Sequence, residues 1–507
     1  MALFRTRSAT VFGIDAQLID VEVDMYPGGS GRDFITVGMP DTAVRESRER
    51  IKSALMNGGY GYPNKSVTIN LAPANVRKEG AGFDLPMAIG ILGAMGMVPQ
   101  SEEFLVTGEL SLDGGLRPVR GALSMAVCAR NRGIGNLVVP RENAPEAAVV
   151  DGVRVFGLSH LCDVVRLLSR ETEFPAARPS DGDTAAAFAV GTPDFVDVRG
   201  QTTAKRALEV AAAGGHNLLL IGPPGSGKTM LARRLPGILP PLTFAEALET
   251  TQIHSVAGLL EPGAGLLAAR PFRSPHHSTS DAGLIGGGSA SPRPGEISLA
   301  HNGVLFLDEL PEFARNVLEV LRQPLEEGTV TIARSNMTLT FPADVMLVGS
   351  MNPCPCGHLA DPTHECRCTG AIVQRYLGKI SGPLLDRIDL HVEVPVVPYQ
   401  ELRARDAGAT SAQMRDRVLA ARARQQSRGV YNSRLTSAQV REFCALDSAA
   451  ERTLEMAVRK LGLSARAHDR VLKVSRTLAD LEGVPAVAAK HVAEAVQYRS
   501  LDRNYWT

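Results

Sequence analysis

The chain has 507 residues, of which 44% are hydrophobic and 21% are charged, the composition of a globular protein with enough apolar material for about three domains. Its 54 Lys and Arg residues balance 54 Asp and Glu residues, so the chain as a whole is not a polycation that coats nucleic acid. Residues 401–507 nevertheless carry 19 basic and 12 acidic side chains, a local excess that is available to an anionic partner.

No stretch of the sequence predicts a membrane segment or export. The longest apolar stretch, residues 83–98, is interrupted by an aspartate, a proline and three glycines, and it is shorter than the roughly 20 residues that cross a bilayer. The amino-terminal residues lack the apolar run and cleavage site of a signal peptide. Seven cysteines are too few for a disulfide scaffold of this length. We therefore expect a cytoplasmic protein without membrane association.

The first 170 residues alternate β-rich and helical patterns and predict an α/β domain. Asp41 is placed to cap a helix that ends near Met56. Further predicted elements are strands in residues 10–23 and 67–71, a buried helix over residues 84–95 and a hairpin turn at Asp113-Gly114.

Three further segments follow this domain. Residues 171–195 are rich in Pro, Ala, Ser and Asp without a sustained period, which is typical of an interdomain linker. Residues 196–400 alternate strand and helix in the manner of a parallel sheet. Residues 401–507 are rich in Arg and Ala at first and then show helical apolar spacing, which predicts a helical C-terminal domain.

A phosphate-binding loop is predicted between the apolar run of residues 217–221 and a helical pattern that starts at Met230. The backbone amides of such a loop point at phosphate oxygens, Lys228 can reach the β- and γ-phosphates, and the Thr229 hydroxyl can bind magnesium. A glycine-rich turn without a ligand is the alternative, which this context disfavours. The loop residues that would hold ATP are Gly222, Pro223, Pro224, Gly225, Ser226, Gly227, Lys228 and Thr229.

A metal-binding acid is expected on a neighbouring strand. Residues 304–307 are four apolar residues that lead directly into Asp308 and Glu309. Asp308 is predicted to hold magnesium, and Glu309 to polarise the attacking water. The sequence therefore predicts an ATP hydrolase and not a static nucleotide binder.

These two motifs resemble those of the AAA+ ATPases, and the resemblance points to three further residues. Asn352, at the end of an apolar run, matches sensor 1, whose amide orients the lytic water. Arg387, in an Asp-Arg-Ile-Asp segment, resembles the arginine finger of the magnesium-chelatase and MCM branches, and Arg466 resembles sensor 2. For each arginine, a surface salt bridge is the alternative. A finger supplied by a neighbouring subunit implies a homo-oligomer, which in this family is a hexameric ring.

The residues between and after the two motifs resemble the YifB/ComM family more narrowly. Within the stretch that resembles a helix-2 insertion, Arg273 and Arg293 are candidate contacts for a DNA backbone. His276, His277 and Asp281 could hold a metal, but a loop rich in Gly, Pro and Arg that faces a ring pore is the preferred interpretation. The resemblance is carried by residues 270–281, 286–289, 293–303 and 307–313.

Residues 328–341 alternate β-branched and polar side chains around an Arg-Ser-Asn turn, which predicts a hairpin just before the sensor-1 strand. Related motors carry a pore hairpin at this place. Arg334 at the tip could track a phosphate backbone, but no aromatic residue at the tip indicates base stacking. A purely structural hairpin is the alternative.

A cysteine cluster follows Asn352 and predicts a closed tetrahedral zinc site of structural type. His358 and His364 are rival ligands, and free or redox-active thiols are the alternative. The four thiolates belong to Cys354, Cys356, Cys366 and Cys368.

Residues 66–90 resemble the Lon-protease-type domain at the front of YifB/ComM proteins. Lon proteases place a serine in the short glycine-rich segment, but residues 79–84 contain no Ser, Thr or Cys. We therefore expect the fold without peptidase activity, in a binding or ring-stabilising role. Lys78 is expected to be a surface charge.

The expected architecture is α/β: a Lon-type (ribosomal-protein-like) domain at residues 1–170, an AAA+ parallel sheet at residues 196–400 and a helical lid at residues 401–507. The resemblance implies a ring-forming ATPase with ATP and Mg²⁺ as cofactors. Its expected substrate is single-stranded or branched DNA, on which it would act as a helicase that promotes branch migration during transformation or recombination, with recombination proteins as further partners. A protein-remodelling ATPase and, less favoured, a metal-chelatase motor subunit are the alternatives.

Overall fold

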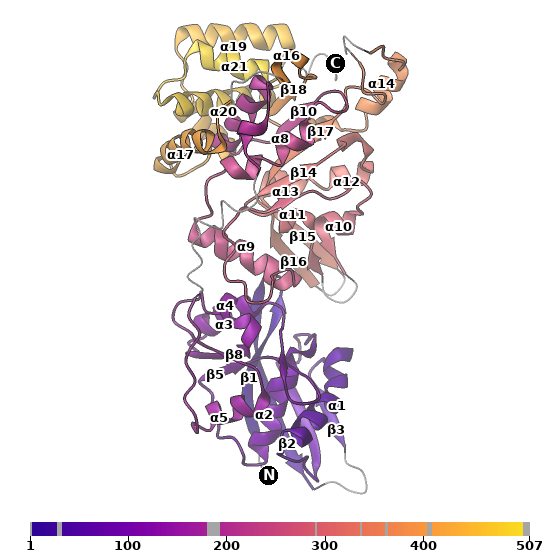
Figure 1. Cartoon of the computed structure of the whole chain (residues 1–507), viewed down its shortest axis with the longest axis vertical. Coiled ribbons are helices and arrows are strands. Elements are labelled where there is room, and N and C mark those ends of the chain that lie inside the picture. Colours follow the sequence, from indigo (N-terminus) through magenta and orange to yellow (C-terminus); the bar gives the residue numbers. More distant parts are fainter. Residues whose placement is uncertain are drawn as a thin grey trace. The chain divides into compact units, whose positions relative to one another are not determined.

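The computed structural model describes residues 3–27, 33–179, 193–288, 292–334, 337–359, 364–402 and 408–499 (Figure 1). The chain packs into two units. The N-terminal unit comprises Met1–Asp183 and Phe244–Leu267, and the C-terminal unit comprises Thr184–Thr243 and Ala268–Thr507. Most of the predicted linker, residues 180–192, lies outside the described residues.

The N-terminal unit is built on a seven-stranded mixed sheet with strand order β3-β4-β2-β1-β5-β8-β9. β1 and β2 pair antiparallel from Phe4↔Val23 to Phe12↔Asp15, so the predicted strand pair is confirmed and is longer than expected. The strands are β1 (Phe4–Phe12), β2 (Asp15–Tyr26), β3 (Phe34–Val37), β4 (Ser66–Ala72), β5 (Phe104–Val106), β8 (Asn136–Pro140) and β9 (Arg154–Leu158).

The predicted local signals of this unit are also confirmed. The Asp41 side chain accepts a hydrogen bond from the Val44 N–H at the start of α1. Asp113-Gly114 joins β6 (Glu109–Leu110) to β7 (Leu116–Arg117), which pair antiparallel. The helices of the unit are α1 (Thr42–Asn57), α2 (Asp84–Ala94), α3 (Ala122–Asn131), α4 (Ala144–Ala147), α5 (Leu161–Leu168) and α9 (Phe244–Ala257).

Apolar side chains on both faces of the sheet give this unit two cores. In β8, Val138 belongs to the core that α1, α2 and α5 cover, whereas Leu137 and Val139 belong to the core of α3 and α4. This division follows from the two-residue period of a strand. Leu248 of α9 packs against the second core, and the Ser255 hydroxyl of α9 donates to the buried Glu146 carboxylate of α4 at 2.5 Å. The segment that follows the phosphate-binding loop in sequence is therefore part of the N-terminal unit.

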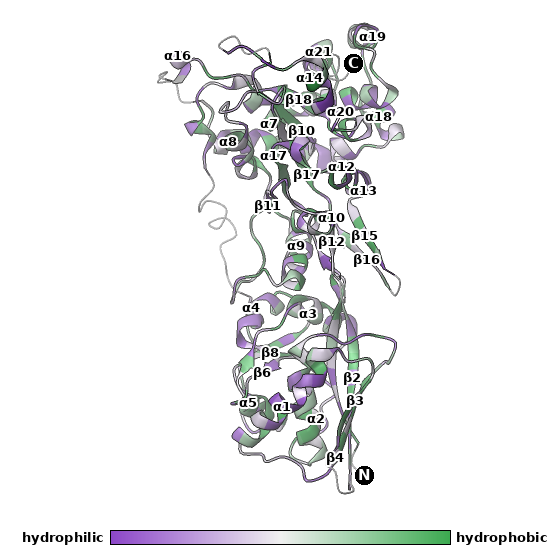
Figure 2. Cartoon of the chain, turned by 90° about the vertical axis from the view of Figure 1, so that its right-hand side faces the viewer, coloured by the Kyte–Doolittle hydropathy of each residue, from purple (hydrophilic) through white to green (hydrophobic). Residues whose placement is uncertain are grey.

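The C-terminal unit contains a five-stranded parallel sheet with order β11-β14-β17-β10-β18. Every residue of β10, β14 and β17 is buried, and Figure 2 shows hydrophobic residues concentrated along β10 and β17, as expected for parallel strands covered on both faces. The predicted α/β class is confirmed. The strands are β10 (Leu218–Ile221), β11 (Phe272–Arg273), β14 (Val304–Leu307), β17 (Met346–Met351) and β18 (Leu390–Glu393).

Short helices and two hairpins surround this sheet. The predicted hairpin is present as β15 (Thr329–Arg334) and β16 (Met337–Pro342), paired from Thr329↔Pro342 to Arg334↔Met337; residues 335 and 336 of its turn lie outside the described residues. The other elements are α7 (Thr202–Gly214), α8 (Lys228–Ala232), α10 (Asp281–Ile285), β12 (Gly286–Gly287), β13 (Arg293–Pro294), α11 (Glu296–Leu299), α12 (Arg315–Glu319), α13 (Arg322–Glu327), α14 (Gly370–Leu377), α15 (Gly382–Leu385) and α16 (Tyr399–Leu402).

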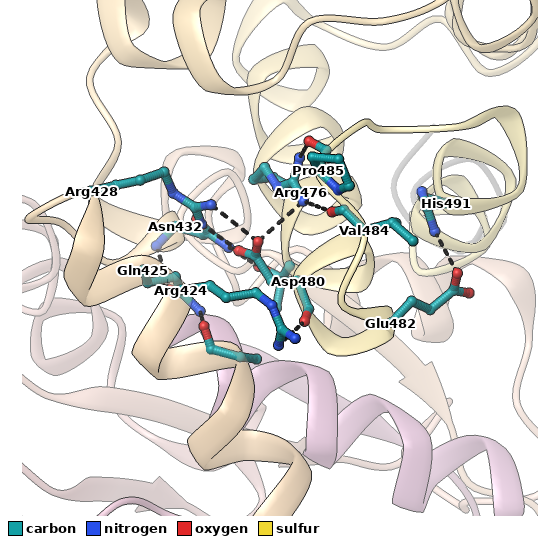
Figure 3. Close-up of polar contacts among 12 residues, drawn as sticks. Arg424, Gln425, Arg428, Asn432, Arg476, Asp480, Glu482, Val484, Pro485 and His491 are labelled. Carbon is teal, nitrogen blue, oxygen red and sulfur yellow. Dashed lines mark hydrogen bonds and ion pairs between the residues drawn. The ribbon is translucent and has the colours of Figure 1, made fainter.

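The last part of the unit is a bundle of helices around a buried carboxylate. Asp480 accepts hydrogen bonds from the guanidinium of Arg428 and, at 2.8 Å, from the Asn432 amide, and it forms an ion pair with Arg476 at 3.1 Å (Figure 3). None of the helices within the described ranges is long and apolar enough to span a bilayer. The helices of the bundle are α17 (Ser411–Ser427), α18 (Ser437–Phe443), α19 (Ser448–Leu461), α20 (Ala465–Glu482) and α21 (Ala489–Gln497).

Candidate active site

The predicted phosphate-binding loop connects β10 to α8. Gly227 immediately precedes α8 with a φ of 94°, a backbone conformation that favours glycine. Lys228 begins α8, and its Nζ donates to the carbonyl oxygens of Gly222 at 2.7 Å and Pro223 at 2.9 Å. The same Nζ lies 3.3 Å from Oδ1 of Asn352. The Lys228 ammonium group therefore contacts both the phosphate-binding loop and Asn352, the predicted sensor-1 residue.

The Lys228 ammonium lies in a mostly buried environment. Burial lowers its pKa, and the nearby carboxylates of Asp308 and Glu309 partly offset this effect. A buried cation of this kind favours an anionic ligand, because each added negative charge compensates the loss of hydration.

Thr229 and Asp308 lie side by side, although they are 79 residues apart in sequence. The Thr229 hydroxyl donates to Oδ2 of Asp308 at 2.7 Å, and the Ser350 hydroxyl donates to the other carboxylate oxygen. Hard oxygen ligands of this type suit Mg²⁺, which usually takes one or two protein oxygens together with phosphate oxygens. The oxygen atoms of Thr229 and Asp308 could therefore hold a magnesium ion.

Glu309 adopts an unusual backbone conformation directly after the buried strand β14. Its φ is 54°, in the left-handed region that non-glycine residues rarely adopt outside special sites. Its side chain is 58% exposed, and Oε2 lies 3.6 Å from Nδ1 of His277. Sequence reasoning missed this partner, because the approach of residue 277 to residue 309 depends on the fold of the intervening chain.

The four predicted cysteine ligands converge directly after Asn352. Their sulfur atoms all lie within 4.8 Å of one another, and three of the pairs are 3.3, 3.6 and 3.7 Å apart. Four sulfurs at the usual Zn–S length of about 2.3 Å are roughly 3.8 Å apart in a tetrahedron. The cluster can therefore hold a metal ion.

The cysteine loop packs directly on the phosphate-binding loop. Gly357 has a φ of 83°, and a Cβ atom there would lie only 2.3 Å from Cδ of Pro224. Backbone N–H groups of His358 and Arg367 lower the pKa of Cys356 to about 6, so its metal-binding thiolate form is accessible at neutral pH. Because Gly357 contacts Pro224, the conformation of the cysteine loop affects the conformation of the phosphate-binding loop.

His276, His277 and Asp281 do not form a comparable cluster. The Asp281 carboxylate accepts hydrogen bonds from the Asn316 amide at 2.6 and 2.8 Å. Among the described residues, the four cysteines are the only group of three or more His, Cys, Asp or Glu side chains whose ligand atoms lie close enough together to hold a metal ion.

The comparisons with known proteins identify the family of the chain. Three family models match: "Subunit ChlI of Mg-chelatase" over residues 21–143, "Magnesium chelatase, subunit ChlI" over residues 194–402, and the ChlI C-terminal model over residues 408–499. The chain is 46% identical to Competence protein ComM of Haemophilus influenzae over 508 residues, which cover 99% of this chain and 98% of that protein. The chain belongs to the YifB/ComM family of magnesium-chelatase-like AAA+ ATPases.

Two other relatives show how far the similarity reaches. Uncharacterized protein YifB of Escherichia coli is 45% identical over 99% of this chain and 98% of its own length. The magnesium-chelatase 67 kDa subunit of Chlorobaculum parvum is 28% identical, over 42% of this chain and 28% of that protein. Full-length similarity is therefore to the ComM and YifB proteins, and the similarity to this chelatase subunit is partial.

Arg387 lies near the amino-terminal end of β10, whereas the phosphate-binding loop begins at the carboxyl-terminal end of the same strand. Its carbonyl oxygen accepts a hydrogen bond at 2.9 Å from Asn217, the residue before β10, whereas the loop follows the end of β10. The four residues of that strand separate the two edges by about 13 Å. The Arg387 guanidinium is buried, with 6% of the residue exposed, and forms an ion pair with Glu326. The structure therefore places Arg387 in an intrachain ion pair whose carboxylate partner is half-exposed.

Arg466 lies at the same edge as Arg387 and not beside the phosphate-binding loop. Its side chain is 69% exposed and approaches Oδ2 of Asp386 at 4.0 Å. The next arginine on α20, Arg470, forms an ion pair with the buried Asp389. The helical bundle thus places two arginines beside the segment that carries Arg387.

A buried polar network connects this edge to the centre of the bundle. Nδ1 of His216 lies 3.2 Å from the Asp389 carboxylate, and its Nε2 lies 2.8 Å from the Thr477 hydroxyl. Thr477 in turn accepts from the Asn432 amide at 3.1 Å. The same amide donates to Asp480 at 2.8 Å, a contact that Figure 3 shows. The network fixes the segment around Arg387 to α20.

The three candidate DNA-contacting arginines have different environments. Arg273 forms a bidentate ion pair with Glu296, with both contacts at 2.7 Å. Arg293 and Arg334 are exposed. Arg293 pairs with Gly287 in the β12–β13 hairpin, and Nη2 of Arg334 lies 3.6 Å from the place that a Cβ atom at Gly287 would occupy. The two hairpins that carry Arg293 and Arg334 are therefore adjacent, although they are distant in sequence.

One expectation for the N-terminal unit was wrong. Lys78 is not a surface charge: it is fully buried, its Nζ donates to the Pro73 carbonyl, and burial lowers its pKa. Beside the glycine-rich segment, the buried Thr107 hydroxyl donates to the Gly82 carbonyl at 3.2 Å. The backbone hydrogen bonds of residues 78–80 with Met39 and Asp41 hold this region in place.

Proposed function

We propose that the chain is a ring-forming ATPase that moves along DNA, a ComM-like helicase that promotes branch migration. Lys228 would contact the β- and γ-phosphates of ATP, and Glu309 would act as the base toward the attacking water. Asn352 would orient that water. Thr229 and Asp308 would hold Mg²⁺, which neutralises phosphate charge when bound. The meeting of these side chains at the carboxyl edge of parallel strands supports this assignment.

The position of Arg387 supports catalysis at the interface between subunits. Because Arg387 lies at the amino edge of its own sheet, it can reach a γ-phosphate only in a neighbouring molecule. Arg466, beside Asp386, would approach the same neighbouring phosphate. Each subunit would then present a phosphate-binding loop on one side and arginines on the other, the head-to-tail arrangement that closes into a ring. We propose a hexamer.

The observation that carries the DNA assignment is that the exposed Arg293 and Arg334 belong to two adjacent hairpins. Exposed guanidinium groups on adjacent hairpins suit contacts with the phosphates of a nucleic acid strand. The excess of basic residues in 401–507 agrees with an anionic substrate. Arg273 would support the insertion through Glu296 and would not contact the strand directly.

ATP turnover measured with and without a four-stranded DNA junction tests this proposal. We expect the junction to stimulate turnover and to be converted to duplex products only when ATP is present. Stimulation should fall with rising salt, because phosphate contacts release counterions. Arg293→Ala with Arg334→Ala should reduce the stimulation, and Arg315→Ala on α12 is a matched control. Turnover that ignores DNA but rises with a protein partner would instead indicate a protein-remodelling ATPase.

We also propose that Cys354, Cys356, Cys366 and Cys368 bind one structural zinc ion per subunit. The sulfur spacing fits this ion, and the contact between Gly357 and Pro224 gives it a role in ordering the phosphate-binding loop. The zinc would take no part in hydrolysis.

Cys356→Ser is expected to remove the zinc, to lower the Tm by roughly 5 °C or more, and to weaken ATP binding, because the loop beside Pro224 loses its order. Elemental analysis, thermal unfolding and nucleotide titration measure the three effects. Cys162→Ser, outside the cluster, is the control. Two results together would contradict the zinc site: the native protein contains no zinc, and its four clustered thiols react as fast as those of the unfolded chain.

For the N-terminal unit we propose a non-proteolytic role. The glycine-rich segment has no nucleophile, and the neighbouring Thr107 hydroxyl is buried and already donates to Gly82. A binding or ring-stabilising role is the function consistent with these features.

A further inference from the structure

The Arg387 side chain makes two polar contacts with residues of its own chain. Nη1 donates to the Pro383 carbonyl at 2.5 Å, and Nη2 donates to the Glu326 carboxylate. The Nε atom is buried and has no partner among the described residues. Glu326 therefore supplies the one anionic partner of this guanidinium among the described residues, and a phosphate of another subunit would compete with it.

Glu326 balances an otherwise basic environment around Arg387. Burial is the largest effect on the pKa of Arg387 and lowers it; Glu326 raises the pKa, and Arg322, Arg466 and Arg470 lower it further. A negatively charged phosphate would offer Arg387 the same compensation as Glu326 does. The carboxylate and a neighbouring γ-phosphate are therefore competitors for one guanidinium.

The backbone around Arg387 has more fixed contacts than the Arg387 side chain has. The nearby Asp389 is buried and contacts His216, Arg470 and the Asn217 N–H, so the backbone has fixed neighbours. The Glu326 side chain is 55% exposed, whereas the Arg387 side chain is 7% exposed, so water can replace Arg387 as the hydrogen-bond donor to this carboxylate when the pair separates. The guanidinium can therefore leave Glu326 while the backbone stays in place.

Glu326 is also joined to the β15–β16 hairpin. It lies in the last turn of α13, which ends at Gly328 with a φ of 68° and leads directly into β15. Gly328 accepts a hydrogen bond at 2.7 Å from Ala343, just after β16. The exposed Arg334 lies six residues further along β15, about 20 Å from this base. A tilt of the hairpin would therefore move Glu326.

We propose that Glu326 is a positioning residue that retains the Arg387 guanidinium within its own subunit and releases it when the β15–β16 hairpin engages DNA. This inference rests on the proposed function, because it assumes that Arg387 acts on ATP in a neighbouring subunit. Substrate binding at the hairpin would then increase the fraction of subunits whose arginine can reach the phosphate. DNA stimulation of turnover would follow from this increase.

Substitution of Glu326 tests the inference in the full chain. Glu326→Gln and, more strongly, Glu326→Ala should raise DNA-free ATP turnover by about three- to tenfold, because a larger fraction of Arg387 becomes competent. The ratio of turnover with and without junction DNA should fall by a similar factor. Glu327→Gln is the matched control, because its carboxylate accepts from Gln323 at 2.9 Å on the same helix. Glu326→Ala should also lower the Tm, because the buried Arg387 loses the carboxylate that compensates its charge; a merely structural role of Glu326 would lower the Tm without raising turnover.

Arg387→Ala separates failure of this inference from failure of the proposed function. If Arg387→Ala loses turnover but Glu326→Gln and Glu326→Ala keep the wild-type rate and DNA ratio, Arg387 is catalytic and retention by Glu326 is refuted. Slower turnover in the Glu326 variants would refute it too. If Arg387→Ala turns over normally, the interfacial site and this inference both fail. The double variant Glu326→Gln with Arg387→Ala should be as inactive as Arg387→Ala.

Discussion

Glu309→Gln should reduce ATP turnover by about 10²- to 10⁴-fold, the usual contribution of a general base, while ATP binding is retained. The amide keeps the size of the side chain but cannot accept a proton from the attacking water. Lys228, Thr229 and Asp308, which would hold the phosphates and magnesium, are unaltered. Turnover is measured by phosphate release, and binding by titration with a fluorescent ATP analogue.

Two companion variants make this result specific. Glu312→Gln, three residues further on, removes a carboxylate that pairs with Lys379 at 3.3 Å and should leave turnover near the wild-type rate. Lys228→Ala should instead lose tight ATP binding, because the ammonium that faces the phosphates is gone. Normal hydrolysis by Glu309→Gln would show that another group activates the water.

Arg387→Ala should lower turnover on the order of a thousandfold, as expected for an arginine finger. The decisive measurement is the ATP turnover of a mixture of Arg387→Ala and Lys228→Ala subunits. Each variant is expected to be inactive alone. In a mixed ring, an intact phosphate-binding loop of the first variant can meet an intact Arg387 of the second. Random one-to-one mixing should restore about a quarter of the interfaces.

Arg375→Ala, which removes an exposed arginine of α14, serves as the control for loss of a positive charge. If mixed Arg387→Ala and Lys228→Ala subunits stay inactive although they assemble, Arg387 does not act across an interface. If the wild-type chain hydrolyses ATP at full rate as a strict monomer, the interfacial site is wrong as a whole.

The nucleotide site was accessible to sequence reasoning because its signals are local. The strand before Lys228, the glycines of the loop and the apolar residues before Asp308 each occupy one short stretch, and each forms the expected element. The hairpin before the sensor-1 strand was predictable for the same reason, since its alternating side chains define its register.

The remaining features depend on contacts between distant residues, which no short pattern encodes. Lys78 was expected at the surface because it stands beside Glu79, yet the fold buries it against Pro73. The approach of His277 to Glu309 and the ion pair between Glu326 and Arg387 likewise depend on tertiary packing. Charged residues give no sequence signal for such partners, because the same pattern is typical of a solvated surface.

The inclusion of α9 in the N-terminal unit means that the two units are interlaced in sequence. The chain passes between them at residues 183–184, 243–244 and 267–268. Cutting the chain within residues 171–195 would not liberate two complete modules, since the carboxyl-terminal fragment would retain α9 without the partners of Leu248 and Ser255. Replacing the N-terminal unit by another domain would therefore require two exchanges in the chain, one before residue 184 and one at residues 244–267.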